Sequence, residues 1–357
     1  MRASSGHRRH RLGLIIGALI LAVVATEVLL RVGLRTATWD RLGQPAAYFD
    51  PLCDDNHWRA LRRGAWGQAL HRIGPQERHP TLGWTPHTPS LDSRGAFPTL
   101  SPPRNPESTI ALFGDSYIFG TTPQGTRIAD ALSALRPHAE VLNFGVGGYG
   151  LDQILLRLED RVGVLPTGSW VFIGALTTDI DRTILQVRDA PKPWFTLSEG
   201  GALRLNPPPD VPVTQWFDDH PITATSLLWQ RLRRTWQLRA ARGSESTEPQ
   251  CAVAQKTALS HALLSRMASV CAEAQLNCAL LSMQRPIDLT QGAGWRAELY
   301  RSAPHHGLGL IDTGPLMKNL PEGWSDLYGA DSHPSPAGNR QLATWIDQFL
   351  SDQGPKN

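Results

Sequence analysis

Two short segments, far apart in the sequence, carry residue types that could perform nucleophilic catalysis. Gly114-Asp115-Ser116 follows an apolar run, and Asp331-Ser332-His333-Pro334 stands near the C-terminal end. A serine hydroxyl is a poor nucleophile until a histidine accepts its proton, and that histidine needs an acceptor on its second ring nitrogen. We therefore expect Ser116 to be a nucleophile, His333 its base, and Asp331 the residue that orients the histidine.

Each segment also has a purely structural interpretation when it is taken alone. Ser116 could cap an ordinary strand-to-helix turn, and Ser335 could cap the helix that follows His333. The catalytic interpretation is favoured because the serine stands at the end of a strand and because both segments occur in one chain. A helix that follows such a serine can also offer backbone N–H groups to a developing oxyanion.

Five short apolar runs bounded by turn residues predict strands that are buried on both faces of a sheet. These runs are residues 110–113, 141–144, 170–173, 279–281 and 308–311. Stretches with helical spacing separate or follow them, at residues 128–135, 152–162, 253–276, 295–301 and 337–350. This alternation predicts a doubly wound α/β domain with about five parallel strands, whose ligands bind beyond the carboxyl ends of the strands.

The rest of the chain divides by composition around that domain. We expect a basic tail (1–11), a membrane span (12–34), a Pro/Trp-rich extension with a short helix near 57–72 (35–107), the α/β domain (108–350) and a C-terminal tail (351–357). An insertion at about 182–250 interrupts the alternation and contains a basic helix at 225–242 with two tryptophans. Such an insertion caps a site, packs on a partner, touches a membrane or covers an edge of the sheet.

The N-terminal segment predicts an anchor in the inner (cytoplasmic) membrane. Four arginines precede the apolar segment 12–34, which is long enough to cross a bilayer once, and the positive-inside rule then places the remaining chain outside the cytoplasm. Glu27 and Arg31 lie near the outer end, where they can pair or reach the interface. The alternative is a cleaved signal peptide ending near Val23-Val24-Ala25, which gives the same periplasmic or extracytoplasmic location.

Composition and cysteine spacing limit the other classes of function. The formal net charge is +3 and is concentrated at the N-terminus, so we expect no nucleic-acid partner. In an exported protein the four cysteines, Cys53, Cys251, Cys271 and Cys278, allow three complete disulfide pairings. No metal-binding motif occurs, so we expect no metal and no cofactor. His305 and His306 are expected on an exposed turn.

The motifs named above resemble those of the SGNH/GDSL hydrolase family. Gly114-Asp115-Ser116 looks like its nucleophile block, Asp331-Ser332-His333-Pro334 like its last block, and Asn143-Phe-Gly-Val-Gly-Gly-Tyr149 like its second. The resemblance implies a flavodoxin-like three-layer α/β/α fold and an oxyanion hole that includes the N–H groups of Ser116 and Gly148. In the third block Thr178 stands where the family has asparagine, so its hydroxyl is the expected third donor to the oxyanion hole, although its shorter side chain reaches less far.

The resemblance further implies a serine esterase that forms a covalent acyl-enzyme on O-acyl groups of an extracytoplasmic glycan or lipid. One alternative is a glycan O-acyltransferase that uses the same site, and another is a noncatalytic glycan-binding or assembly protein that retains the fold. A rival motif, Gly145-Val-Gly-Gly-Tyr-Gly150, matches a dinucleotide fingerprint. We disfavour it because it follows the second strand and leaves Ser116 and His333 without a role.

Overall fold

A five-stranded parallel sheet forms the centre of the α/β domain. The computed structural model describes residues 4–36, 44–63, 76–87, 90–100, 102–241 and 251–354. The strands are β3 (Ser108–Gly114), β4 (Ala139–Asn143), β5 (Trp170–Leu176), β8 (Asn277–Met283) and β9 (Gly309–Asp312), in the order β4-β3-β5-β8-β9. The five predicted strands and their parallel arrangement are therefore confirmed. The order is that of a flavodoxin-like sheet, with its switch point beside β3.

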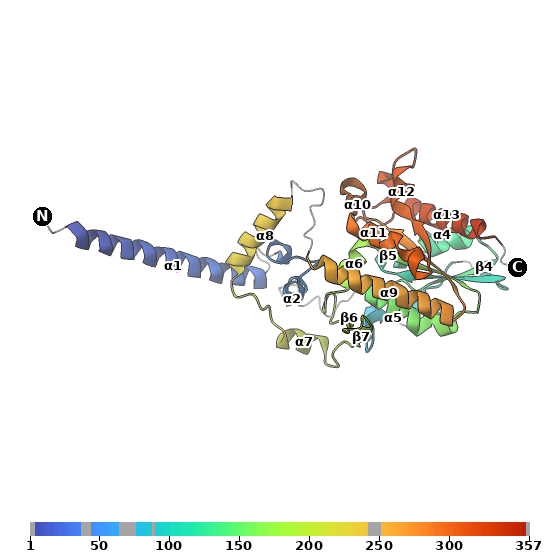
Figure 1. Ribbon diagram of the computed structural model, residues 1–357, viewed down its shortest axis with the longest axis horizontal. Coiled ribbons are helices and arrows are strands. Elements are labelled where there is room, and N and C mark those ends of the chain that lie inside the picture. Colours follow the sequence, from blue (N-terminus) through green and yellow to red (C-terminus); the bar gives the residue numbers. More distant parts are fainter. Residues whose placement is uncertain are drawn as a thin grey trace.

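Helices cover both faces of this sheet and complete three layers (Figure 1). One face packs against α5 (Leu151–Arg161) and α9 (Val253–Glu273), and the other packs against α4 (Ile128–Leu135) and α13 (Pro336–Asp352). Successive side chains of β3 point to opposite faces of the sheet. Ala111 and Phe113 pack toward α5 and α9, whereas Ile110 and Leu112 pack toward α4 and α13. This double burial explains the continuous apolar runs in the sequence.

Several short elements surround the sheet. The helices are α3 (Ser116–Phe119), α6 (Thr177–Arg182), α10 (Pro286–Gln291), α11 (Trp295–Arg301) and α12 (Thr313–Lys318), with 3-10 turns η4 (Val162–Val164), η5 (Ala303–His306) and η6 (Ser325–Leu327). Two antiparallel hairpins are formed by β1 (Gln76–His79) with β2 (Gly83–Pro86), and by β6 (Trp194–Leu197) with β7 (Leu203–Asn206). Of these short helices the sequence predicted only α11, which is the longest; each of the others has six residues or fewer, too few to show a helical period.

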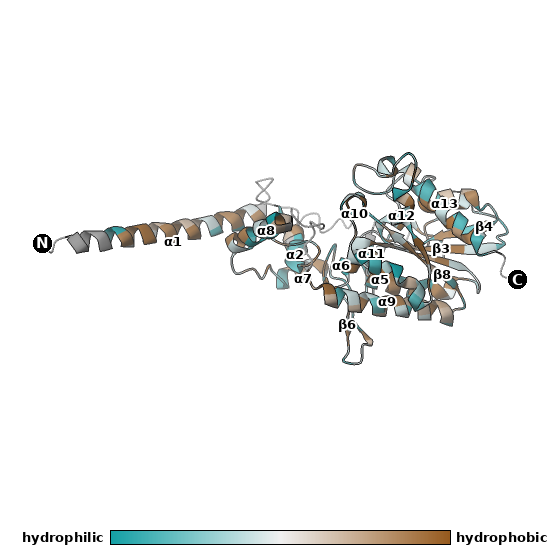
Figure 2. Cartoon of the chain, turned by 45° about the horizontal axis from the view of Figure 1, so that its top comes forward, coloured by the Kyte–Doolittle hydropathy of each residue, from teal (hydrophilic) through white to brown (hydrophobic). Residues whose placement is uncertain are grey.

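The N-terminal helix α1 (Ser4–Thr36) extends away from the domain (Figure 1). Its stretch His10–Leu34 is long and apolar enough to cross a membrane, and Figure 2 shows hydrophobic residues along most of it. At its C-terminal end Leu30 and Leu34 pack in a small cluster with Tyr48, Phe49 and Leu227. That cluster joins α1 to η1 (Pro45–Ala47), α2 (Asp55–Arg63) and α8 (Leu227–Ala241).

The extension and the insertion pack on each other rather than forming a separate α/β unit. The insertion contains β6, β7, α7 (Val213–Asp219) and α8, and the predicted basic helix is α8. The helix predicted near 57–72 is α2, which begins at Asp55, and the part of the predicted range beyond Arg63 lies outside the described residues. Among the pairings that the sequence left open, the structure has Cys53–Cys251 and Cys271–Cys278.

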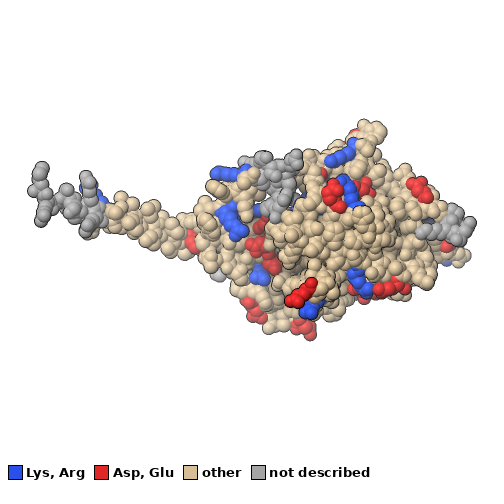
Figure 3. Space-filling model, in the orientation of Figure 1, with Lys and Arg blue, Asp and Glu red and all other residues tan. Residues whose placement is uncertain are grey.

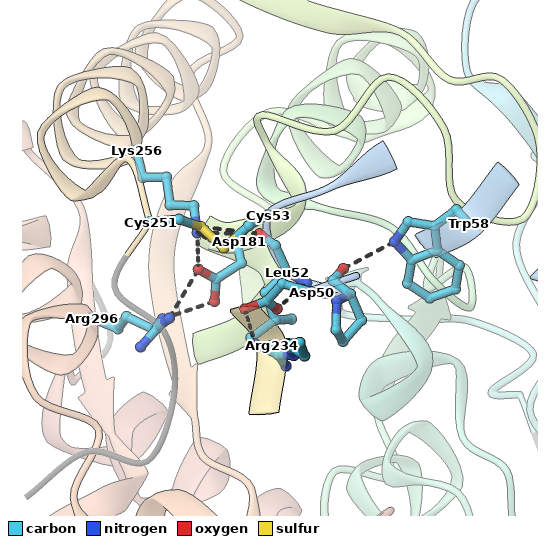
Figure 4. Close-up of a disulfide and its surroundings, with 10 residues drawn as sticks. Asp50, Leu52, Cys53, Trp58, Asp181, Arg234, Cys251, Lys256 and Arg296 are labelled. Carbon is cyan, nitrogen blue, oxygen red and sulfur yellow. Dashed lines mark hydrogen bonds and ion pairs between the residues drawn. A yellow bond between two sulfur atoms is a disulfide. The ribbon is translucent and has the colours of Figure 1, made fainter. Parts of the chain in front are cut away.

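The Cys53–Cys251 disulfide connects the N-terminal extension to the start of α9 (Figure 4). Beside it, Lys256 Nζ donates to Asp181 Oδ1 at 2.5 Å, and Arg296 Nε donates to Asp181 Oδ2 at 2.8 Å. All three charged residues are buried. Each buried charge thus has a partner, and the network joins α6, α9 and α11 without leaving an unpaired ion. Lys256 Nζ also donates to the carbonyl oxygen of Leu52 at 3.2 Å, which ties the network to the extension.

The expectation for the adjacent histidines was only half right. His305 is exposed, but His306 is partly buried, and its Nε2 lies 3.0 Å from Nδ1 of His261. His306 Nδ1 also lies 2.8 Å from Ser265 Oγ. In the short 3-10 turn η5 the two side chains point in different directions, so His306 contacts α9 while His305 faces the solvent.

Candidate active site

Ser116 lies directly beyond the carboxyl end of β3, at the first position of α3. Asp115 caps this helix, since its carboxylate accepts a hydrogen bond from the N–H of Tyr117 at 2.9 Å. The helix ends after one turn at Gly120, whose φ of 81° is readily adopted by glycine. Because Ser116 is the first residue of α3, its N–H group has no acceptor within the helix. This N–H group points outward from the N-terminal end of the helix.

Three glycines let α3 approach the strand ends closely. Gly114 of β3 and Gly174 of β5 are register partners, and a β-carbon on either one would overlap the side chain of Ile118. A β-carbon on Gly145, in the loop after β4, would overlap the backbone of α3. The missing side chains at these positions therefore allow the helix that carries Ser116 to rest on the sheet backbone.

Asn143 fixes the other end of this short helix. The side chain is buried at the end of β4, and its Nδ2 donates to the carbonyl oxygen of Ile118 at 2.9 Å. Its Oδ1 accepts a hydrogen bond from the N–H of Gly145 at 2.9 Å. Sequence analysis placed Asn143 in the second motif without giving it a role, because its partner lies in another element.

The segment that carries His333 forms a tight turn before α13. The Gly329 N–H donates to the carbonyl oxygen of His333 at 2.8 Å, and Ser332 has a positive φ of 66°. The Tyr117 hydroxyl donates to the carbonyl oxygen of Ser332 at 2.6 Å, so the residue after the candidate nucleophile also holds this turn. The turn is therefore fixed from α3, which places Ser116 and His333 in one local structure.

The histidine meets the serine at this point. His333 Nε2 lies 3.0 Å from Ser116 Oγ. On the other side of the ring, Asp331 Oδ2 lies 3.1 Å from His333 Nδ1, but not in line for a hydrogen bond. The Asp331 side chain is 61% exposed and that of His333 is 26% exposed. Hydrogen bonds of this kind are often poorly aligned before substrate binds, so the distance is the more informative quantity.

The other predicted site residues follow the two strands that flank β3. Gly148 lies in the loop after β4 with a φ of 84°, and Thr178 is the second residue of α6, after β5. Both residues are buried, and Thr178 Oγ1 has no hydrogen-bond partner among the described residues. Because parallel strands end at one edge of the sheet, both positions lie at the same edge as Ser116. Their role in an oxyanion hole stays a prediction.

A buried charge network lies beneath the serine. Arg182 Nη1 lies 3.0 Å from Asp115 Oδ2 and 2.5 Å from Asp179 Oδ1, and it donates to the carbonyl oxygen of Tyr149 at 2.7 Å. Burial raises the pKa of the Asp179 carboxyl, and the charge of Asp115 raises it further, whereas the charge of Arg182 lowers it. No local pattern in the sequence indicates this network, because Arg182 and Asp115 belong to distant segments.

Two arginines and an aspartate lie near Gly148. A β-carbon at this position would overlap the Arg188 guanidinium, which forms an ion pair with Asp189. Arg62 of α2 pairs with the same carboxylate, and the Arg188 guanidinium lies 5.1 Å from the centre of the Trp58 ring. The N-terminal extension therefore contributes side chains beside the loop that holds Gly148.

Neither the glycine-rich loop nor the acidic residues point to another kind of site. Gly145 of the rival fingerprint packs against α3, so this part of the loop is occupied by the helix of the candidate nucleophile. Within the described parts of the chain, no group of three or more His, Cys, Asp or Glu side chains is arranged to hold a metal ion.

Comparisons with known proteins give only distant similarities. No family model and no curated protein sequence matches the chain. Similar solved structures include a lipase/acylhydrolase from Enterococcus faecalis, with 16% identity, 70% of this chain and 99% of that chain covered, and a TM-score of 0.41. A member of the lipolytic protein G-D-S-L family from Veillonella parvula has 13% identity, coverage of 68% and 98%, and a TM-score of 0.39.

A catalytic mutant of an acetylxylan esterase from Geobacillus stearothermophilus is also similar, with 14% identity, coverage of 70% and 95%, and a TM-score of 0.35. At this distance a shared fold does not carry an activity from one protein to another. The residues and geometry described above therefore have to support the function themselves.

Proposed function

We propose that this chain, which resembles the SGNH/GDSL hydrolases, is a serine esterase anchored in a membrane. The observation that carries the proposal is the distance of 3.0 Å between His333 Nε2 and Ser116 Oγ. A histidine within hydrogen-bond reach of a serine at a helix N-terminus is the arrangement that nucleophilic acyl transfer requires. A binding module that merely kept the fold would not need this pair.

The reaction would proceed through two acyl transfers. Ser116 Oγ attacks the ester carbonyl while His333 Nε2 accepts its proton, and the protonated ring then donates that proton to the leaving alkoxide. A water molecule next attacks the seryl ester and loses its proton to His333, which then gives that proton to Ser116 Oγ as the bond to the acyl carbon breaks and the carboxylic acid leaves. Asp331 would orient the ring and stabilise its charged form.

The tetrahedral intermediates need donors for their oxyanion. The N–H of Ser116, the N–H of Gly148 and the hydroxyl of Thr178 are the groups we assign to this task. The Thr178 hydroxyl, which has no partner among the described residues, supports the assignment, because buried donors nearly always have a partner and an exception calls for an explanation such as a role in catalysis.

The substrate we propose is an O-acyl group on a glycan or lipid outside the cytoplasm. Two features support this location: α1 can cross a membrane, and all four cysteines form disulfides, which persist in oxidising compartments. The arginines before the apolar stretch favour a cytoplasmic N-terminus, which leaves the α/β domain on the periplasmic or other extracytoplasmic side.

Labelling with a fluorophosphonate tests the proposal directly. The reagent should form a covalent adduct on Ser116 of the full chain, and Ser116→Ala should abolish the adduct. Ser332→Gly is a matched control, because it removes a nearby hydroxyl and suits the positive φ at that position. Failure of the native chain to react, with the serine variant still active in cells, would favour a noncatalytic binding protein.

Product analysis separates the hydrolase from the acyltransferase. With a short activated ester and no added acceptor, a hydrolase releases free acid in multiple turnovers. A transferase would stop after acylation of Ser116 and resume only when a sugar hydroxyl is supplied. Resumption of that kind would replace water with a glycan as the final acceptor while leaving the roles of Ser116 and His333 unchanged.

A further inference from the structure

The helix α8 presents its large apolar side chains outward. Trp229 is 63% exposed, Leu232 53% and Trp236 78%. Together with Arg233 and Gln237 they line an apolar hollow on the surface. Contiguous exposed apolar surface of this kind marks a site of interaction rather than an ordinary water-facing helix.

The opposite face of α8 carries arginines toward the protein. Arg234 is buried, and its Nη1 donates to Asp50 Oδ2 at 2.8 Å. The Arg231 guanidinium lies 5.6 Å from the centre of the Tyr48 ring. Two arginines of α8 therefore face the protein while both tryptophans face outward, which is unusual for a surface helix in water, so the outer face fits a partly apolar environment.

A residue of the proposed membrane span holds the start of α8. The Glu27 carboxylate of α1 accepts hydrogen bonds from the N–H groups of Leu227 at 2.9 Å and Leu228 at 3.0 Å. It also accepts one from Ser226 Oγ at 3.0 Å, while Arg31 Nη2 donates to the carbonyl oxygen of Thr225 at 3.0 Å. The carboxylate thus caps α8 from another helix, which fixes the position of α8 along α1.

The contact between Glu27 and the start of α8, called the Glu27 clamp, lies where the outer boundary of a bilayer is expected. Residues 10–26 of α1 are exposed along their whole length, and buried contacts begin beyond Glu27, at Leu30. About 20 residues cross the hydrocarbon core, so a span that begins at Leu12 ends close to Arg31. In Figure 1, α8 lies beside the end of α1 nearest the α/β domain and runs obliquely to it, between the anchor and that domain.

We propose that α8 lies in the interface of the bilayer that α1 crosses, with Trp229, Leu232 and Trp236 at the boundary between headgroups and acyl chains. Tryptophan favours this region, and an amphipathic helix with basic residues binds there. The exposed Arg233 and Arg239 would meet anionic headgroups, and Figure 3 shows Lys and Arg side chains gathered over this part of the molecule. The inference rests on the proposed anchoring by α1.

This contact would orient the catalytic domain toward the membrane surface. The Arg234–Asp50 ion pair and the nearby Cys53–Cys251 disulfide connect α8 to the extension and to α9 (Figure 4). A helix fixed both to the bilayer and to the domain prevents free rotation about α1. The site at the strand ends would then keep a constant direction relative to the lipid surface.

A fluorescent label on the outer face of α8 tests the inference in the full chain. An environment-sensitive nitrobenzoxadiazole group would be attached to Gln237→Cys, with one protein copy in each nanodisc of zwitterionic and anionic lipid. Leu19→Cys in α1 serves as the embedded reference, and Ser269→Cys on the exposed side of α9 serves as the aqueous reference. Labelling is done without reductant, so that both disulfides stay intact.

We expect the label at position 237 to shift its emission to the blue and to lose intensity when lipids carry a nitroxide near the headgroup. The label at position 269 should show neither change. In the Trp229→Gln/Trp236→Gln variant, the quenching at position 237 should fall while the label at position 19 stays embedded.

Other outcomes would overturn the inference in distinguishable ways. An embedded label at 19 with a water-like label at 237 removes the interfacial role of α8 and leaves the anchor in place. A water-like label at 19 removes the anchor and the inference together, and leaves the proposed catalytic roles of Ser116 and His333 in place. Protection of position 237 only in crowded vesicles would identify a second copy of the chain, rather than lipid, as the partner of α8.

Discussion

The Arg182 guanidinium lies 3.0 Å from the carboxylate of Asp115, the residue that directly precedes the candidate nucleophile Ser116. Asp115 caps α3 and is completely buried, as is Asp179, the second carboxylate that contacts Arg182. The position of Ser116 therefore depends on a cation supplied by a segment 67 residues away. Arg182 does not touch the reacting atoms and acts as a positioning residue.

Replacing this cation should destabilise the chain strongly. Arg182→Met leaves two buried carboxylates without their cation, which costs about 3–5 kcal/mol. Arg266→Met is the matched control, because Arg266 pairs with Glu159 and Glu273 at the surface and its loss costs less than about 1 kcal/mol. Urea unfolding of both variants in detergent gives the comparison, and equal losses of stability would show that the buried network contributes nothing special.

Two adjacent threonines offer a sharp test of the oxyanion hole. Thr177 Oγ1 donates to Asp288 Oδ2 at 2.6 Å, whereas Thr178 Oγ1 has no described partner. Thr178→Val should therefore leave stability almost unchanged and lower kcat by roughly 10²–10³, the cost of losing one oxyanion donor. Thr177→Val should reduce stability, with a smaller loss of kcat. Unchanged turnover in Thr178→Val would leave a hole made of backbone N–H groups alone.

Gly148 can be compared with a glycine of the same conformation elsewhere. Gly148 has φ 84° and would place a β-carbon against Arg188, while Gly168 has φ 80° and a β-carbon added there would meet nothing within 4 Å. Gly168→Ala should cost about 1–2 kcal/mol of stability with normal turnover, because only the left-handed backbone is penalised. Gly148→Ala should also lower kcat, and Arg188→Ala in the same chain should restore part of it.

The acid sensitivity of the chain should depend on His57 in α2. Burial, together with the charge of Arg234, lowers the pKa of this histidine from 6.5 to about 4. The unfolded chain binds a proton as pH falls below 6.5 while the folded chain does not, so stability decreases down to about pH 4. The difference between these pKa values corresponds to about 3 kcal/mol.

His57→Asn removes the titrating group and should reduce this pH dependence. Unfolding by urea at pH 7 and pH 4.5, with native chain and variant side by side, measures the difference. An identical loss of stability in both proteins would assign the acid sensitivity to other groups.

Local patterns in the sequence were sufficient for the sheet and for the two motifs that meet at its edge. Continuous apolar runs identified β3, β4, β5, β8 and β9, because both faces of each central strand are buried. Helical spacing similarly located α4 and α11 with their observed bounds. The candidate Ser116 and His333 could be found because each stands in a short motif next to such an element.

Features that depend on contacts between distant segments could not be found in this way. The Arg182–Asp115 pair, the bond from Asn143 to α3 and the Cys53–Cys251 disulfide join residues whose own neighbours carry no sign of the partner. The same holds for the clamp between Glu27 and α8, since Glu27 alone suggested only pairing with Arg31. Tertiary contact, rather than local pattern, determines these features.

The geometry at His333 predicts a graded response to changes in the proposed triad. Ser116→Ala and His333→Ala should each abolish hydrolysis of a short activated ester, because neither variant can form an activated nucleophile. Asp331→Asn should retain roughly 100-fold more activity than either, as the orienting aspartate contributes less in comparable triads. The exposure of Asp331 and its imperfect line to His333 Nδ1 support this smaller effect.

The double variant Ser116→Ala/His333→Ala should be scarcely less active than either single variant, because members of a triad act as a unit. Steady-state rates for the four variants, with folding checked by circular dichroism, provide the measurement. Multiplicative losses in the double variant would mean that Ser116 and His333 act independently, in which case their separation of 3.0 Å would not reflect a shared catalytic step.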